Sequence, residues 1–312
     1  MDSSMLFSPF TMLKFSRMFD VYNLFPPDDS YALMRRLLEA ERKHLLAPMM
    51  DEMSHAVRSK LKLVPQLVQQ HNLDDLTDQF VQWVVDVNFE SAFLAAALKR
   101  ADPIEAGLVD LGNIAVLESA IGTGRPIVLA PLHLGPCYVC LPILASRFPL
   151  TTLYHKMPLN ELKKEFFDHI DIRGIEVPAP QTLYRCVSVL KEGRILSMFP
   201  ELDPAGPGRL HVRVPFFDVE VKAPSGPALL SQRYHALIVP CVFRRTAPAR
   251  YRFTFFDPID AAAGNEGRIR AIAKIFRSLE QELTISEPGA WEMWWEFDQI
   301  IALQWRTRMH QG

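Results

Sequence analysis

The chain has 312 residues, of which 49% are hydrophobic and 22% charged, and its formal net charge is −2. These values are typical of a folded globular protein with a large core, and they give no support to nucleic-acid binding. Four cysteines are too few for a disulfide framework. An early acid and Lys14 argue against a secretory signal, so we expect a cytoplasmic protein.

The N-terminal segment 5–19 is apolar but interrupted by Lys14 and Arg17. Two interpretations stay open: the segment packs on the protein's own core, or it makes a peripheral contact with the inner membrane. Residues 126–146 are also apolar and uncharged, over about the 20 residues that a transmembrane helix needs. Four prolines, a glycine and a histidine favour a strand, a tight turn and a helix there.

Helical patterns dominate the first third of the chain. Residues 28–46 begin with acids and keep helical spacing, and residues 73–100 repeat this and end in basic residues. No strand pattern precedes residue 125. We predict a helical N-terminal region over residues 1–110 that packs on an α/β domain over residues 111–312, the two forming one structural unit.

From residue 126 onward, short apolar runs alternate with helical patterns. The runs predict strands at 126–132, 150–156, 174–177, 194–202, 214–217, 236–243 and 250–259. Helical spacing predicts helices at 160–170, 182–193, 225–235 and 266–283. This alternation predicts an α/β fold with a mixed, largely parallel central sheet flanked by helices.

Three short motifs are weak. Residues 122–126 resemble a phosphate-binding loop, but they precede a strand, whereas such a loop joins a strand to a helix. Cys137 and Cys140 have metal or redox spacing without a second ligand pair, so we expect buried thiols and no metal. No G-x-S-x-G pattern marks a serine hydrolase.

His133 is the stronger candidate, because it ends a predicted buried strand where a Gly-Pro pair turns the chain into a helix. Functional groups of open α/β sheets collect beyond the carboxyl ends of the strands. Another predicted strand ends just before Glu201 and Asp203. If the two strands are neighbours, a carboxylate fixes the tautomer of His133 and makes its other nitrogen a better base. The alternatives are a structural histidine, with turn chemistry and helix capping for the two acids.

Six short sequence stretches within residues 110–300 are informative together. They are His133-Leu-Gly135, Pro200-Glu201, Val214-Pro215-Phe216-Phe217, Ser225-Gly226-Pro227, Ala236-Leu-Ile-Val-Pro240-Cys-Val-Phe243 and Pro288-Gly-Ala-Trp291. Their order and spacing resemble the lipid A late acyltransferase family, within the wider lysophospholipid acyltransferase group. The resemblance implies acyl transfer with the histidine of an H-x4-[DE] motif. It favours Glu201 as the partner of that histidine, because Glu201 stands at the aspartate position of the family's Pro-Asp segment.

The chain departs from the family pattern at three points. Tyr138 stands where the motif has its acid, Asp218 stands where the family usually has a glycine, and the family's N-terminal membrane helix is missing. We therefore interpret the chain as a diverged, soluble member. Either Glu201 or Asp203 then orients His133, and Tyr138 supplies a hydroxyl in the space that the acid vacates.

Substrate contacts are expected around these stretches. Backbone N–H groups near Gly135 or at the helix start 225–227 are candidate oxyanion donors. Eight basic residues from Arg209 to Arg252 predict a face for a phosphopantetheine donor, and a solvated surface is the alternative. Cys137 is spaced for contact with His133, which leaves a Cys–His nucleophile open. The expected substrate-binding residues are Gly135, Cys137, Arg209, Phe216, Phe217, Ser225 and Gly226.

The C-terminal stretch 280–298 contains six acids and no basic residue. We expect its tryptophans to pack in the core, with ligand binding as the alternative. The 20 phenylalanines of the chain permit an apolar acyl channel.

We predict an acyltransferase that uses no metal or other cofactor. His133 acts as general base on a hydroxyl or amine of the acceptor. The acceptor is a small molecule or a lipid, and one interpretation is that the enzyme works in specialised metabolism. The donor is a thioester of coenzyme A or of an acyl carrier protein. Two alternatives stay open: a thioesterase-like variant, and an inactive member that binds an acyl carrier protein or lipid. The inactive member requires a His133 that faces only Tyr138, Cys137 and apolar groups.

Overall fold

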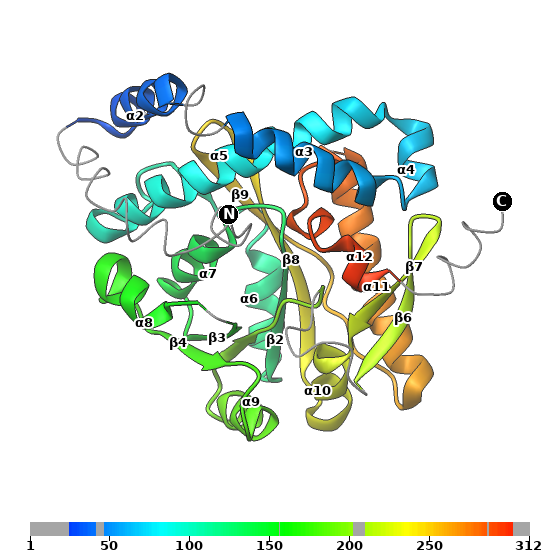
Figure 1. Cartoon of the computed structure of the whole chain (residues 1–312). Coiled ribbons are helices and arrows are strands. Elements are labelled where there is room, and N and C mark those ends of the chain that lie inside the picture. Colours follow the sequence, from blue (N-terminus) through cyan, green and yellow to red (C-terminus); the bar gives the residue numbers. More distant parts are fainter. Residues whose placement is uncertain (1–24, 42–46, 156, 202–209, 286, 302–312) are drawn as a thin grey trace.

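A central sheet of seven strands organises the chain (Figure 1). The computed structural model describes residues 25–41, 47–155, 157–201, 210–285 and 287–301. The strand order is β1-β9-β8-β2-β5-β3-β4, and every neighbouring pair is parallel except β8 and β9. This arrangement confirms the predicted mixed, largely parallel sheet flanked by helices and preceded by a helical N-terminal region.

Strands β2, β3, β4, β5, β6, β8 and β9 overlap the predicted apolar runs, whereas β1 and β7 were not predicted. Their bounds are β1 Val109–Asp110, β2 Ile127–Leu132, β3 Leu150–Tyr154, β4 Ile172–Glu176, β5 Ile195–Ser197, β6 His211–Phe216, β7 Val219–Pro224, β8 Leu237–Ala247 and β9 Arg250–Phe255. Strands β6 and β7 form a separate antiparallel hairpin.

The prediction that no strand precedes residue 125 is wrong, because β1 pairs with β9 at one edge of the sheet. Two residues are too short to show an alternating pattern. The region that we assigned to helices therefore contributes to the sheet, and a domain boundary between residues 110 and 111 stays a prediction.

Helices precede the sheet and connect its strands. Their bounds are α2 Pro27–Glu41, α3 Ala47–Leu61, α4 Pro65–Gln70, α5 Leu73–Arg100, α6 Ala115–Gly122, α7 Cys137–Ala145, α8 Leu159–Leu162, the π-helical turn η4 Lys163–Phe167, α9 Thr182–Lys191, α10 Gly226–Tyr234, α11 Gly264–Ile285, the 3₁₀ turn η5 Glu292–Trp294 and α12 Phe297–Ile300. Asn72 caps α5 by accepting hydrogen bonds from the N–H groups of Asp74 and Asp75. Gly193, with φ +73°, follows α9 as its predicted stop.

Apolar cores lie on both faces of the sheet. Strand β2 shows this directly, because Leu129 belongs to the core that includes α6 and α7, whereas Ala130 and Leu132 belong to the core that includes α3 and α11. Helix α8 contributes to the first of these cores, and α11 with the β6–β7 hairpin contributes to the second. Figure 1 shows the orange α11 beside that hairpin. The strand is buried at all six positions, so its carboxyl end is held rigidly.

Strands β2 and β5 are parallel neighbours, so their carboxyl ends meet at one edge of the sheet. The chain continues from β2 to His133 and from β5 to Glu201. Within the described ranges, no helix is long and apolar enough to cross a membrane. The apolar segment 5–19 lies outside the described residues.

Candidate active site

A buried carboxylate holds the ring of His133. The distance between His133 Nδ1 and Glu201 Oε2 is 2.6 Å. The backbone N–H of His133 donates to Glu201 Oε1 at 3.0 Å, and the indole N–H of Trp291 donates to the same oxygen at 2.6 Å. Glu201 is completely buried, so these donors replace the water that its carboxylate loses.

The charge of Glu201 also acts on the imidazole. Burial by itself lowers the pKa of His133, but the negative charge and the hydrogen bond of Glu201, followed by the charge of Glu292, outweigh it. The net result is a pKa above the ordinary value of 6.5. With Nδ1 engaged by Glu201, Nε2 is the nitrogen left for a substrate.

The turn that carries His133 is fixed from three sides. The ring of Phe199 packs on the imidazole with 4.1 Å between the ring centroids. The indole N–H of Trp83 donates to the carbonyl of Leu134 at 3.3 Å. Gly135 lies so close to β8 that a Cβ atom there would be 1.8 Å from the carbonyl oxygen of Phe243. Only glycine fits that close approach, which explains the Gly after the histidine.

The first turn of α7 holds Cys137 and Tyr138. Burial, the neighbouring Cys140 thiol and the charges of Glu292 and Glu201 raise the pKa of Cys137 well above its ordinary value. The thiolate that a Cys–His nucleophile needs is therefore disfavoured. Burial, with the charge of Glu292 next, also raises the pKa of Tyr138 well above its ordinary value. In the described part of the chain, no hydrogen bond joins Tyr138 to His133, and Glu201 holds Nδ1 instead.

Sequence reasoning missed Glu292, which reaches the same place from η5. Its backbone N–H donates to the carbonyl of His133 at 3.0 Å. One ligand-type atom each from His133, Cys137 and Glu292 lie within 4.8 Å of one another. Burial, opposed by the charge of His133, raises the pKa of the Glu292 carboxyl, and the charge of Glu201 adds to this. Nitrogen, sulfur and carboxylate oxygen together are donors that zinc accepts.

The other predicted substrate contacts lie in different surroundings. Asp203 and Arg209 lie outside the described residues. The hydroxyl of Ser225 donates to the carbonyl of Leu210 at 2.7 Å. Gly226 lies against Met198, where an added Cβ would be 2.9 Å from the Met198 Cε.

Phe216 is the last residue of β6, and Phe217 follows it. Phe216 is fully buried, with its ring centroid 5.0 Å from that of Trp291. Phe217 is half-buried at the hairpin turn with φ +50°, and its N–H donates to Glu280. Trp291 and Trp294 are fully buried, as expected for packing residues, and Trp291 also holds Glu201.

Several members of the predicted basic face are used inside the molecule. Arg245 pairs with Glu90 at 2.8 Å, and Arg250 pairs with Asp28 at 2.5 Å. Arg252 likewise pairs with Asp110 at 2.7 Å. These contacts leave less free positive charge for a donor than the sequence alone indicates.

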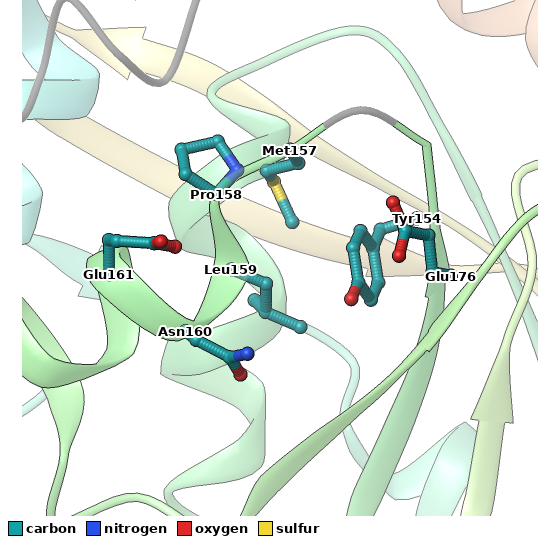
Figure 2. A pocket seen from close by; sticks show the side chains of 7 residues that line it. All are labelled: Tyr154, Met157, Pro158, Leu159, Asn160, Glu161 and Glu176. Carbon is teal, nitrogen blue, oxygen red and sulfur yellow. The ribbon is translucent and has the colours of Figure 1, made fainter.

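A cavity of about 480 Å³ lies beyond the carboxyl ends of β3 and β4 (Figure 2). Its lining residues, which mix apolar groups with two carboxylates, are Tyr154, Met157, Pro158, Leu159, Asn160, Glu161 and Glu176. Strand β3 lies next to β5, which lies next to β2. The cavity therefore opens at the same edge of the sheet as His133.

A family model described as bacterial lipid A biosynthesis acyltransferase matches residues 88–294. The match covers more than half of the chain, including the whole segment from His133 to Glu292. The chain belongs to the bacterial lipid A biosynthesis acyltransferase family. A search of curated proteins returned no match.

Membership in this family indicates acyl transfer as the general activity of the protein. In the H-x4-[DE] motif the acid stands five residues after the histidine, and that position is Tyr138 in α7 here. In this acyltransferase the carboxylate on Nδ1 comes from the segment after β5 instead.

Proposed function

We propose that the protein transfers an acyl group from a thioester to a hydroxyl or amine acceptor, with His133 as general base. The donor is acyl-coenzyme A or an acyl carrier protein. The observation that carries the proposal is the 2.6 Å contact between His133 Nδ1 and the buried carboxylate of Glu201. A histidine fixed in this way presents Nε2 to an acceptor and stabilises the positive charge that it gains.

The reaction is a direct transfer. The acceptor attacks the thioester carbonyl carbon while His133 takes the acceptor's proton at Nε2. The first turn of α7 leaves backbone N–H groups without helical partners, and these, with the N–H of Gly135, stabilise the oxyanion. The tetrahedral intermediate then expels the thiolate, which receives the proton from His133. Products are the acylated acceptor and a free thiol.

Direct transfer is favoured over the alternatives by the surroundings of the histidine. A covalent route through Cys137 conflicts with the two nearby carboxylates, which oppose a thiolate. An inactive binding member would need an imidazole that faces only Tyr138, Cys137 and apolar groups, and Glu201 contradicts that condition. Thioester hydrolysis differs only in that water replaces the acceptor.

Release of free thiol from acyl-coenzyme A and acyl-carrier-protein donors tests the proposal. We expect wild type to release thiol with at least one donor class. We expect the rate for His133→Ala to be lower by a factor of about 100 or more. His169→Ala is the matched control, because His169 is exposed, and it should retain the wild-type rate. Equal rates for wild type and His133→Ala would contradict the general-base role.

A further inference from the structure

Two acceptors of hydrogen bonds lie close together at the proposed site. One is a ring nitrogen of His133, and the other is the half-buried carboxylate of Glu292. Among the residues that the structure describes, none donates a hydrogen bond or forms an ion pair with the Glu292 side chain. A half-buried carboxylate without a donor from the protein is available to accept a hydrogen bond from a substrate.

The two acceptors are close enough to accept hydrogen bonds from one tetrahedral nitrogen. Hydrogen bonds of about 2.9 Å that diverge at the tetrahedral angle end on acceptors about 4.7 Å apart. A Glu292 oxygen and a His133 ring nitrogen lie within 4.8 Å of each other. One atom between them can therefore donate to both without a large movement of either side chain.

An amine and an alcohol differ in this position. A neutral primary amine has two N–H donors and one lone pair, so it can satisfy both acceptors and still direct its lone pair at the thioester carbon. An alcohol has a single O–H donor. If that donor faces His133, a lone pair of the oxygen faces the carboxylate of Glu292, which is repulsive.

The charges around the site favour the same class of acceptor. Glu201 and Glu292 place two carboxylates near one imidazole, and the nearby Cys137 thiol is neutral. An amine that arrives as an ammonium ion is attracted by these carboxylates, and it releases its third proton to solvent before its lone pair attacks. An alcohol carries no positive charge.

We propose that the acceptor is a primary amine, that Glu292 determines this specificity, and that the product is an amide. This inference rests on the proposed acyl transfer. One N–H of the amine donates to Glu292 and the other to His133 Nε2. The lone pair of the nitrogen forms the C–N bond, His133 takes the second proton, the C–S bond breaks, and the thiolate leaves as a thiol with that proton.

Matched acceptors test the proposal. Wild type receives an acyl donor with a primary alkylamine or with the primary alcohol of the same carbon chain. Thiol release is corrected for the reaction without enzyme, and mass spectrometry identifies amide or ester. EDTA is present, because the donor atoms of His133, Cys137 and Glu292 also suit zinc. We expect amide formation to exceed ester formation by at least about 10-fold.

The variant Glu292→Gln should reverse that preference. Its amide N–H can donate to the oxygen of an alcohol, and it no longer offers a carboxylate to the amine. We expect the amine-to-alcohol rate ratio to fall about 10- to 100-fold. Glu287→Gln is the matched control, because Glu287 is exposed on the same segment, and its ratio should equal that of wild type. Thermal unfolding of both variants shows whether they are folded.

The outcomes separate this inference from the proposed function. A wild type that forms esters faster than amides overturns the amine specificity and leaves acyl transfer intact. An unchanged ratio in folded Glu292→Gln overturns the role of Glu292. Absence of thiol release with every donor and both acceptor classes overturns the proposed function and this inference with it.

Discussion

Glu201 combines three contacts in one carboxylate. It accepts hydrogen bonds from the ring and the backbone of His133 and from the indole of Trp291. Two of these donors fix the direction of the carboxylate, so its orientation does not depend on the protonation of the imidazole. A buried acid held in this way can stabilise an imidazolium without rearrangement, which is the requirement for a histidine base.

Glu201→Gln keeps the size of the side chain and removes its charge. The amide must present its NH₂ group to at least one of the donors, so the preferred tautomer of His133 is lost. We expect thiol release to fall by about 100- to 10,000-fold while the protein remains folded. Steady-state kinetics measure this, with Glu105→Gln as control because Glu105 is exposed. A loss below about 10-fold would remove Glu201 from the mechanism.

The pH dependence of activity follows from the groups that face His133. These are Glu201 after β5, Glu292 in η5, and Cys137 and Tyr138 in α7. The base must be neutral, and its pKa lies above 6.5, so the rate should fall as the pH is lowered through a midpoint above 6.5. A pH profile of kcat/KM measures the midpoint.

Glu292→Gln removes one cause of that raised pKa and should move the midpoint to lower pH. The raised pKa of folded His133 also stabilises the fold below pH 6.5, and this contribution is lost as the pH rises through the folded pKa. A wild-type midpoint below 6.5 would contradict the electrostatic account.

At the scale of elements, the unit that builds the site is β2, its turn and α7. Strand β2 is buried along its whole length, so its carboxyl end has a fixed position. Gly135 allows the turn after β2 to lie against the backbone of β8. Helix α7 then starts at Cys137, directly beside the histidine. The segment from Trp291 to Glu292 closes the site from the opposite end of the chain.

Gly135→Ala tests this unit. The added Cβ would lie 1.8 Å from the carbonyl oxygen of Phe243, and backbone atoms cannot rotate away as a side chain does. We expect a loss of at least about 1–3 kcal/mol in the free energy of unfolding, with thiol release reduced because the turn that carries His133 moves.

Denaturant titration measures this loss. The control is Gly122→Ala at the end of α6, where an added Cβ meets no atom within 4 Å, and alanine should be neutral or stabilising by up to about 1 kcal/mol. Equal midpoints for wild type and Gly135→Ala would contradict the close-approach argument.

At the scale of the whole molecule, a buried network joins the N-terminal helices to the sheet. Glu90 of α5 accepts hydrogen bonds from the hydroxyls of Tyr31 in α2 and Tyr251 in β9, both at 2.6 Å. It also accepts two from the guanidinium of Arg245 and one from the N–H of Ala249. The N-terminal helices are therefore tied to the sheet by polar bonds as well as by the apolar core.

The predictable part of the molecule was the part with local patterns. The parallel sheet followed from alternating apolar runs and helices. The place of His133 at a strand end made it a candidate with Glu201 or Asp203 as its partner, and the family resemblance favoured Glu201. Glu292 lacked such a signal, because it is one of six acids in a stretch without alternation, far along the chain from His133. The Pro288-to-Trp291 stretch, which directly precedes Glu292, was the nearest stretch that the family resemblance included. Only the folded chain shows which of the neighbouring acids lies close to His133.

Glu90→Ala tests the network that joins the two regions. Glu90 is completely buried, and its removal leaves two tyrosine hydroxyls without their acceptor and Arg245 with Asp86 alone. Breaking a buried ion pair from one side costs about 3–5 kcal/mol, so we expect a loss of that size in denaturant titration. Glu39→Ala is the control, because its ion pair with Arg35 is exposed at Glu39 and should contribute about 0.5 kcal/mol or less. If both variants lose the same small amount, the Glu90 network does not hold the helices to the sheet.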